Sequence, residues 1–251
     1  MMLSESQERM LLILNSGKEE NAKKIFKKWG LDFSIIGKTT DTKNLLLIYD
    51  NKEVANIPLS YLSDDAPVYD RKWKKNKKQK KIKKTKEIDS TQLLQSFKKI
   101  LSSPNNSNKS WVWEQYDHTV MGDTIQKPGG DSAVVRIHGQ NKAIAVTVDS
   151  SADYCSANPF LGAKQVVSET WRNLISVGAA PIAITNCLNF GNPEKNKIMG
   201  QFVETIEGIT DACKYLDFPV VSGNVSFYNE TQNNSISPTP TIGGVGLINK
   251  L

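Results

Sequence analysis

Three short segments of the sequence are rich in the polar side chains that bind phosphorylated or polyhydroxylated ligands. They cover residues 4–7, 185–194 and 222–230, and each adjoins an apolar run that predicts a buried strand. Ligands of α/β proteins bind at the carboxyl ends of strands, which favours the second and third segments as ligand loops. The first segment is a weaker signal, because a plain N-terminal loop explains it equally well.

The segment 222–230 combines a glycine with hydrogen-bonding side chains. Gly223 would let backbone N–H groups approach a phosphate, and the Asn224 amide oxygen suits Mg²⁺, a hard ion that keeps few protein ligands. Ser226 and Asn229 add further polar groups. The sequence contains neither a Walker pattern nor a GxGxxG motif that opens a helix. The spacing therefore predicts a phosphate or metal loop without deciding between the two.

The segment 185–194 predicts a turn between a strand and a helix, because Asn and Gly permit left-handed backbone conformations. Its asparagines either contact a ligand or simply tolerate the turn, and both interpretations stay open. Cys187 has no histidine beside it in sequence, so nucleophilic catalysis has little support. His118 is better explained as a loop residue bonded to Asp117 than as a catalytic base, and His138 as a residue at a strand end.

The elements that would position the last two segments form an α+β pattern over residues 110–251. We expect strands at 133–137, 143–148, 180–185, 218–221 and 241–248, and helices at 162–177 and 198–216. Both helices keep apolar residues at helical spacing, and Gly178 follows the first as a stop. These elements suit one mixed or antiparallel sheet with helices on one face.

Residues 1–66 predict only half of a domain. We expect a helix at 18–29 that ends at Gly30, and strands at 10–14, 33–37, 45–49 and 54–57. This unit has too little helix to cover a sheet, so we expect it to need a partner segment from outside the chain.

A basic run separates these two parts. Residues 71–86 hold eleven Lys or Arg and no acid, and without them the net charge of +6 becomes −5. A like-charge block cannot bury apolar area, so we expect a charged, solvated linker over 67–109, with a loop at 102–108. Binding of RNA or acidic lipid is the alternative, although Trp73 is the only aromatic residue in the run and base stacking has little support.

The composition of this 251-residue chain excludes several classes of protein. Hydrophobic residues make up 39% and charged residues 23%, as in an ordinary globular protein. No apolar run approaches the roughly 20 residues of a membrane span, and the start has no secretory pattern. The three separated cysteines predict reduced thiols and a cytoplasmic protein rather than a disulfide framework or a paired-cysteine zinc site.

Longer stretches of the sequence resemble one enzyme family, the phosphoribosylformylglycinamidine synthases, in their separate-subunit form. The matching stretches recur in family order at 2–11, 64–71, 127–131, 187–194, 222–230 and 238–240. The family's subunit has two pseudo-equivalent halves, each with an AIR synthase-like N-terminal and C-terminal domain. The resemblance implies that 1–66 is the end of a first C-terminal domain and 110–251 a second N-terminal domain, so that the chain is a middle fragment.

The resemblance also implies roles for individual residues. Substrate contacts match Glu5, Ser6, Gln7 and Ser226, ATP contacts match Asn186 and Gly223, and a Mg²⁺ ligand matches Asn224. The family usually has an aspartate at the position of Asn186, so a charge is missing from that nucleotide contact. The family's catalytic histidines belong to a domain that has no counterpart in this sequence, so no catalytic residue is expected here.

The reaction that the resemblance implies converts formylglycinamide ribonucleotide to the corresponding amidine, using ATP, Mg²⁺ and ammonia derived from glutamine. The implied partners are a glutaminase subunit, a small accessory subunit and the remainder of the synthase chain, with no membrane and with nucleic acid only as a less favoured alternative. Two other interpretations of the residues stay open. One is a stand-alone nucleotide-binding or regulatory module that dimerises through an exposed sheet, and the other is a nucleic-acid binder that uses residues 71–86.

Overall fold

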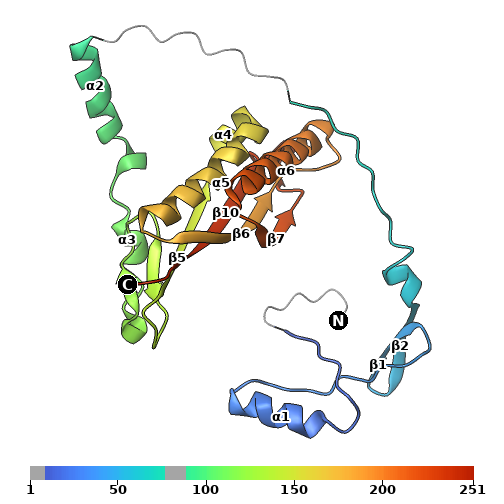
Figure 1. Cartoon of the computed structure of the whole chain (residues 1–251). Helices are drawn as coiled ribbons and strands as arrows, with labels where there is room; N and C mark the ends of the chain where they lie inside the picture. Colours follow the sequence, from blue (N-terminus) through green and yellow to red (C-terminus); the bar gives the residue numbers. More distant parts are fainter. Residues whose placement is uncertain (1–8, 77–88) are drawn as a thin grey trace. The chain divides into compact units, whose positions relative to one another are not determined.

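The computed structural model describes residues 9–76 and 89–251. The chain divides into two compact units, Met1–Tyr69 and Asp70–Leu251 (Figure 1). The described part of the first unit contains helix α1 (Glu19–Lys28), strands β1 (Asn44–Tyr49) and β2 (Lys52–Pro58), and a 3₁₀ turn (Leu59–Leu62). The two strands pair as an antiparallel hairpin. The predicted helix and the two later predicted strands of this unit are therefore confirmed.

Two other strands predicted for the first unit are wrong. Residues 10–14 and 33–37 have no regular secondary structure. A strand needs a neighbour for its backbone N–H and C=O groups, and within the described residues the hairpin pairs only with itself. Met10, Ile13 and Ile36 are between 79% and 83% exposed. Phe33 packs on Phe26 of α1, with ring centroids 5.4 Å apart, but most of these apolar side chains stay exposed.

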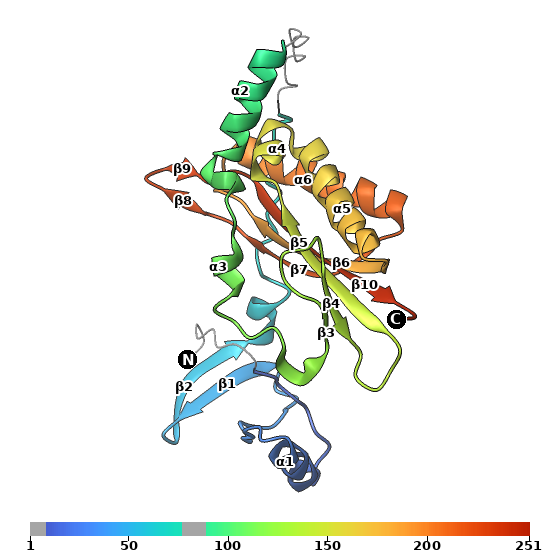
Figure 2. The same ribbon diagram turned by 90° about the vertical axis from the view of Figure 1, so that its left-hand side faces the viewer.

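The second unit is built on a six-stranded sheet in the order β3-β4-β5-β10-β6-β7 (Figure 2). Its strands are β3 (Thr124–Gln126), β4 (Ala133–Arg136), β5 (Ala143–Ser150), β6 (Ala180–Asn189), β7 (Val220–Ser226) and β10 (Thr239–Ile248). All neighbours are antiparallel except β6 and β7, which are parallel. Beyond β7, the short strands β8 (Glu230–Thr231) and β9 (Asn234–Ser235) form a separate hairpin.

Helices cover one face of this sheet, which confirms the predicted α+β arrangement. They are α4 (Ala152–Ala157), α5 (Pro159–Ser176) and α6 (Asn196–Leu216) (Figures 1 and 2). Phe190, Phe218 and Leu174 are fully buried in the core between the helices and the strands. The predicted stop after α5 is also confirmed, because Gly178 has a φ of 79° and its N–H donates to the Ile175 carbonyl.

The opposite face of the sheet carries apolar side chains that the described residues leave uncovered. Alternation along the strands turns these side chains away from the helices. Five of them on β4, β5 and β10 are between 39% and 68% exposed: Val135, Ile144, Val146, Val148 and Val245. The register pairs Val135 with Ile144 and Val146 with Val245, so they form one patch, which we call the open face. Such a face suits packing against a second sheet.

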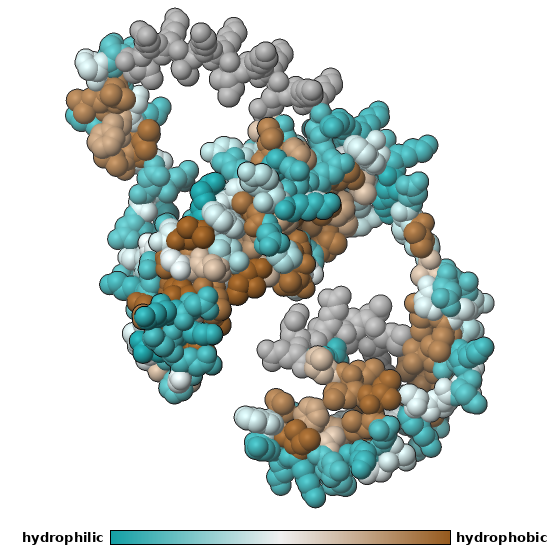
Figure 3. Space-filling view, viewed as in Figure 1, coloured by the Kyte–Doolittle hydropathy of each residue, from teal (hydrophilic) through white to brown (hydrophobic). Residues whose placement is uncertain are grey.

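The range 67–109 differs from the uniform linker that its charge predicts. Residues 77–86 of the basic run lie outside the described residues. Helix α2 (Ser90–Leu101) begins with the Asp89 carboxylate accepting from the Gln92 N–H at 2.8 Å. Its apolar side chains gather on one face and are between 54% and 62% exposed (Figure 3): Leu93, Leu94, Phe97, Ile100 and Leu101. The loop at 102–108 contains the 3₁₀ turn Pro104–Asn106, and α3 (Ser110–Trp113) and the 3₁₀ turn Val120–Gly122 follow.

Among the residues that the structure describes, no helix is both long enough and apolar enough to cross a membrane.

Candidate functional site

The neighbouring parallel strands β6 and β7 bring four of the predicted site residues together. Their register sets Asn186 beside Gly223, and the next pair along joins Cys187 to Asn224. Ser226 lies beside Asn189 at the end of β7. The predicted substrate residues Glu5, Ser6 and Gln7 lie outside the described residues, so their place in the site stays a prediction.

The turn predicted for residues 185–194 is confirmed, but it begins later in the segment than expected, and the strand predicted to end at Val221 is longer. Strand β6 continues from Ala180 to Asn189, and β7 continues through Gly223 to Ser226. Residues 185–189 pair with β10 on one side and with β7 on the other. The sheet therefore satisfies their backbone N–H and C=O groups on both sides, and this outweighs the turn preference of asparagine. The chain turns only after Asn189.

The four residues fall on two faces of the sheet. Asn186 alternates with Leu188, which is buried under the helices, so Asn186 and its neighbour Gly223 belong to the helix-covered face. Asn224 and Ser226 lie on the opposite side of the sheet, the side that carries the open face. The predicted ATP contacts and the predicted Mg²⁺ and substrate contacts are thus separated by the thickness of the sheet at its β7 edge.

The Asn186 carboxamide lies directly over the Gly223 backbone. A Cβ atom at position 223 would overlap Asn186 Oδ1 and Cγ, so glycine is the residue that permits this close approach. An aspartate at position 186 would put a carboxylate in the same place. A ligand that approaches Gly223 would therefore meet a neutral amide here, where an aspartate would present a negative charge.

Asn229 fixes Ser226 from the loop that follows β7. Its Nδ2 donates to the Ser226 carbonyl at 2.9 Å and contacts Ser226 Oγ at 3.2 Å. The same Nδ2 lies 3.0 Å from the Phe190 carbonyl oxygen, beyond β6. The backbone repeats this connection, because the Phe190 N–H donates to the Ser226 carbonyl at 3.0 Å. The loops after the two strands are therefore bound to each other around Ser226.

Glu230 forms a second connection between these loops. One of its carboxylate oxygens accepts from the Asn192 backbone N–H at 3.1 Å and from Lys195 Nζ at 2.8 Å, and the other accepts from Lys195 Nζ at 2.9 Å. The Ser235 hydroxyl donates to the same carboxylate. The hydrogen bond from Lys195, followed by those from Ser235 and Asn192, lowers the pKa of Glu230 to about 2. Sequence reasoning missed this carboxylate, since its partners lie up to 38 positions away.

The residues around Asn224 do not make a Mg²⁺ site by themselves. Within the described ranges, no three His, Cys, Asp or Glu residues gather closely enough to hold a metal ion. Asn224 offers one neutral oxygen, and its ladder neighbour Cys187 offers a soft sulfur that does not suit Mg²⁺. Among the described residues, Asn224 could therefore supply one oxygen ligand but not a complete Mg²⁺ site.

Cys155, Cys213 and the two histidines lie outside β6 and β7, whereas Cys187 is part of β6. Burial raises the pKa of Cys155 and of Cys213 to about 11, while Cys187 is exposed. The predicted hydrogen bond between His118 and Asp117 is wrong, because Asp117 accepts from the backbone N–H and the hydroxyl of Thr119 at 2.7 and 2.6 Å. An Asx turn of this kind satisfies the carboxylate locally.

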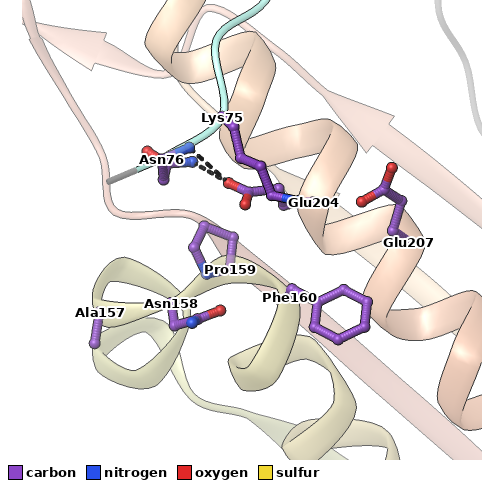
Figure 4. A pocket seen from close by; sticks show the side chains of 8 residues that line it. All are labelled: Lys75, Asn76, Ala157, Asn158, Pro159, Phe160, Glu204 and Glu207. Carbon is purple, nitrogen blue, oxygen red and sulfur yellow. Dashed lines mark hydrogen bonds between the residues drawn. The ribbon is translucent and has the colours of Figure 1, made fainter. Parts of the chain in front are cut away.

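Residues 71–76, which we call the strap, are bonded to α6, so they are not a free linker, although residues 72–75 are exposed as predicted. The Lys74 N–H donates to the Asn196 carbonyl at 3.0 Å, and a Cβ on Gly200 would overlap the Lys74 carbonyl. Asn76 donates through its backbone N–H and its Nδ2 to Glu204, which is 6% exposed, at 3.0 and 2.6 Å. Figure 4 shows these two bonds at the rim of a cavity of about 280 Å³.

The two halves of the sequence match two domain families. Residues 129–248 match the AIR synthase related protein, N-terminal domain, and residues 1–50 match the AIR synthase related protein, C-terminal domain. The sheet, its one-sided helical cover and these matches define an AIR synthase related protein.

Relatives over nearly the whole chain define the family further. Phosphoribosylformylglycinamidine synthase subunit PurL of Pelagibacter ubique (strain HTCC1062) is 62% identical over 248 residues, which is 98% of this chain and 34% of that protein. The chain belongs to this synthase family and spans about a third of the length of the curated relatives it matches. Thermotoga maritima PurL complexed with ATP is 28% identical with a TM-score of 0.70, over 93% of this chain and 36% of that one. T. maritima PurL complexed with FGAR gives the same identity and TM-score over 93% and 35%.

Proposed function

We propose that this chain is the part of a phosphoribosylformylglycinamidine synthase that supplies contacts to ATP and to formylglycinamide ribonucleotide. The observation that carries the proposal is the 62% identity to a PurL subunit over 98% of the chain. Solved relatives of 28% identity are described as complexes with ATP and with FGAR, which supports both ligands. The register of β6 and β7, which sets Asn186 beside Gly223 and places Ser226 two residues beyond Asn224, supports a shared ligand edge.

The proposed roles follow the position of each residue at this edge. Asn186 and Gly223 contact the nucleotide, and Ser226 contacts the ribonucleotide substrate together with Glu5, Ser6 and Gln7. Asn224 would offer one neutral amide oxygen to a Mg²⁺ ion, which would supply positive charge near the transferred phosphate. An aspartate at position 186 would add a Coulomb attraction that the amide lacks. Nucleotide binding is therefore expected to be weaker than with the family's usual residue.

The chemistry that these contacts would serve is phosphoryl transfer followed by displacement. The substrate amide oxygen attacks the γ-phosphorus of ATP and ADP leaves, which gives an O-phosphorylated imidate. Ammonia adds to the imidate carbon, phosphate leaves with the amide oxygen, and the amidine remains. These two reaction steps depend on the orientation of the reactants and on stabilisation of charge more than on a protein nucleophile. The residues of this chain bind and orient, and the acid–base groups belong to the remainder of the subunit.

The proposed partners are the rest of the synthase chain, a glutaminase subunit that releases ammonia, and a small accessory subunit, all in the cytoplasm. The open face of the sheet supports the first of these partners, because an exposed apolar patch of this kind is a packing surface.

Titration calorimetry with Mg-ADP tests the proposed edge. The chain should bind Mg-ADP weakly and only with Mg²⁺, and Asn224→Ala should weaken the binding. Asn234→Ala, at the exposed start of β9, is a matched control that should bind as the unchanged chain does. If Asn224→Ala binds as tightly as the unchanged chain, the metal role of Asn224 is wrong.

The open face also favours a second candidate, a regulatory module that dimerises through this sheet. Val146→Lys, at the centre of the open face, should then convert a dimer to a monomer in sedimentation experiments. A chain that is monomeric without any substitution would remove this candidate.

A further inference from the structure

We propose that Lys195 and Glu230 act as a positioning pair that holds the loop after β7, and through it Ser226, in place for the phosphorylated substrate. The inference rests on the proposed function of Ser226. Neither residue is among those that the sequence pattern or the family resemblance assigns to the site.

The pair joins the loop between β6 and α6 to the β8–β9 hairpin. Glu230 begins β8, Asn192 lies in the loop after β6, and Lys195 comes directly before α6. The carboxylate of Glu230 receives a hydrogen bond from each of the last two and one from Ser235 on β9. Lys195 Nζ also lies 3.4 Å from the Asn233 carbonyl oxygen, in the turn between β8 and β9. Lys195 therefore holds both the start of β8, through Glu230, and the turn between β8 and β9, through Asn233.

The segment between Ser226 and Glu230 depends on this closure. Tyr228 has a φ of 61°, a left-handed conformation that costs about 1 kcal/mol or more in a non-glycine residue and persists only where the surroundings impose it. Its N–H donates to the Gly191 carbonyl at 3.1 Å, and its hydroxyl lies 3.3 Å from Glu194. Asn229, the next residue, holds Ser226. Opening the ion pair would free Gly191 and its neighbours, and with them the contacts that keep Ser226 in position.

The pair suits a positioning role better than direct ligation. Both carboxylate oxygens of Glu230 already accept hydrogen bonds, and its side chain is 16% exposed, so it has little capacity left for a metal ion. Lys195 neutralises a carboxylate that would otherwise repel a phosphorylated ligand. The Lys195 side chain is 44% exposed, but its ammonium group is already paired with the Glu230 carboxylate.

Titration calorimetry with two ligands, FGAR and Mg-ADP, tests the pair. Glu230→Gln and Lys195→Ala should each weaken FGAR binding by about tenfold to a hundredfold, the factor that corresponds to losing one hydrogen bond to a charged group that holds the loop. Mg-ADP binding should change much less, because Gly223 and Asn224 lie within β7, upstream of the loop. Lys195→Arg, which keeps the cation, should restore FGAR binding. The matched controls Lys197→Ala and Glu207→Gln remove exposed charges on α6 and should leave both affinities unchanged.

The outcomes separate this inference from the proposed function. If the unchanged chain binds FGAR and the Glu230 and Lys195 variants bind it equally well, the positioning role is wrong and the proposed function stands. If these variants lose FGAR and Mg-ADP to the same extent, or if Lys195→Arg restores nothing, the pair supports the fold alone and the inference is wrong. If the unchanged chain binds neither ligand, the proposed function fails and this inference fails with it.

Discussion

Asn76→Ala should release the strap from α6, and the contacts give the size of the effect. The substitution removes the 2.6 Å hydrogen bond from Asn76 Nδ2 to the Glu204 carboxylate, which is 6% exposed. A hydrogen bond to a charged group contributes about 1.5–3 kcal/mol. Since each 1.36 kcal/mol is a factor of ten, the strap should open roughly tenfold to a hundredfold more often. The backbone bonds of Lys74 and Asn76 remain available, so the release is partial.

Amide hydrogen exchange followed by NMR measures this opening directly. Protection of the Lys74 N–H, which donates to the Asn196 carbonyl, should fall by the predicted factor. In Gly200→Ala, the protection of the Lys74 N–H should fall further than in Asn76→Ala, because the added Cβ overlaps the Lys74 carbonyl. Asn141→Ala, in the exposed turn between β4 and β5, is the control that should leave the strap unchanged. Unaltered protection of Lys74 in Asn76→Ala would refute the conclusion that Glu204 holds the strap.

Four further outcomes are expected. Asn186→Asp should tighten Mg-ADP binding by about 1–3 kcal/mol, the scale of a charge-assisted contact, and weaker binding would mean that this position does not serve the nucleotide. Cys187 should react with a thiol reagent at pH 8 in the folded chain, whereas Cys155 and Cys213, whose pKa burial raises to about 11, should react only after unfolding. The Glu230 carboxyl should titrate by NMR with a pKa near 2, so its contribution to stability should be complete above its ordinary pKa of 4.5 and lost as the pH falls toward 2. The isolated chain should form no formylglycinamidine ribonucleotide from ammonia or glutamine, and product above a protein-free control would contradict this.

The periodic parts of the fold could be predicted from the sequence. The helix over 198–216 follows from apolar residues that keep a 3.6-residue period for five turns, and α6 covers this range. The residues at which β6 and β7 end could not be predicted in this way. Asparagine and glycine favour turns locally, and only the pairing of residues 185–189 with two neighbouring strands keeps them extended.

Contacts between distant residues were beyond the reach of a single sequence. The bonds from Asn76 to Glu204 join positions 128 apart, and the charge of the basic run predicts solvent there rather than a buried carboxylate. The Lys195–Glu230 pair likewise exists only because the loops after β6 and β7 meet. Helix α2 did leave a signal, since Asp89 suits a helix start and Leu93, Phe97 and Leu101 repeat every four residues.

The candidate site was reached mainly through the resemblance. Residue spacing indicated a phosphate or metal loop around Gly223 and Asn224, and the fold adds that Asn186 lies over Gly223. It also separates the nucleotide residues from Asn224 and Ser226 by the plane of the sheet. No spacing rule could give that separation, because it depends on the register between two strands that are 30 residues or more apart in the chain. The roles of Glu5, Ser6 and Gln7 stay predictions.

The central claim is that this chain supplies a working third of the synthase subunit, and a chimera tests it most directly. The matching third of the Pelagibacter ubique PurL subunit would be replaced by residues 1–251, and ammonia-dependent formation of formylglycinamidine ribonucleotide would be measured. We expect activity comparable to that of the parent subunit, with a strong loss in the chimera that carries Asn224→Ala. A chimera that folds and yet forms no product would contradict the claim.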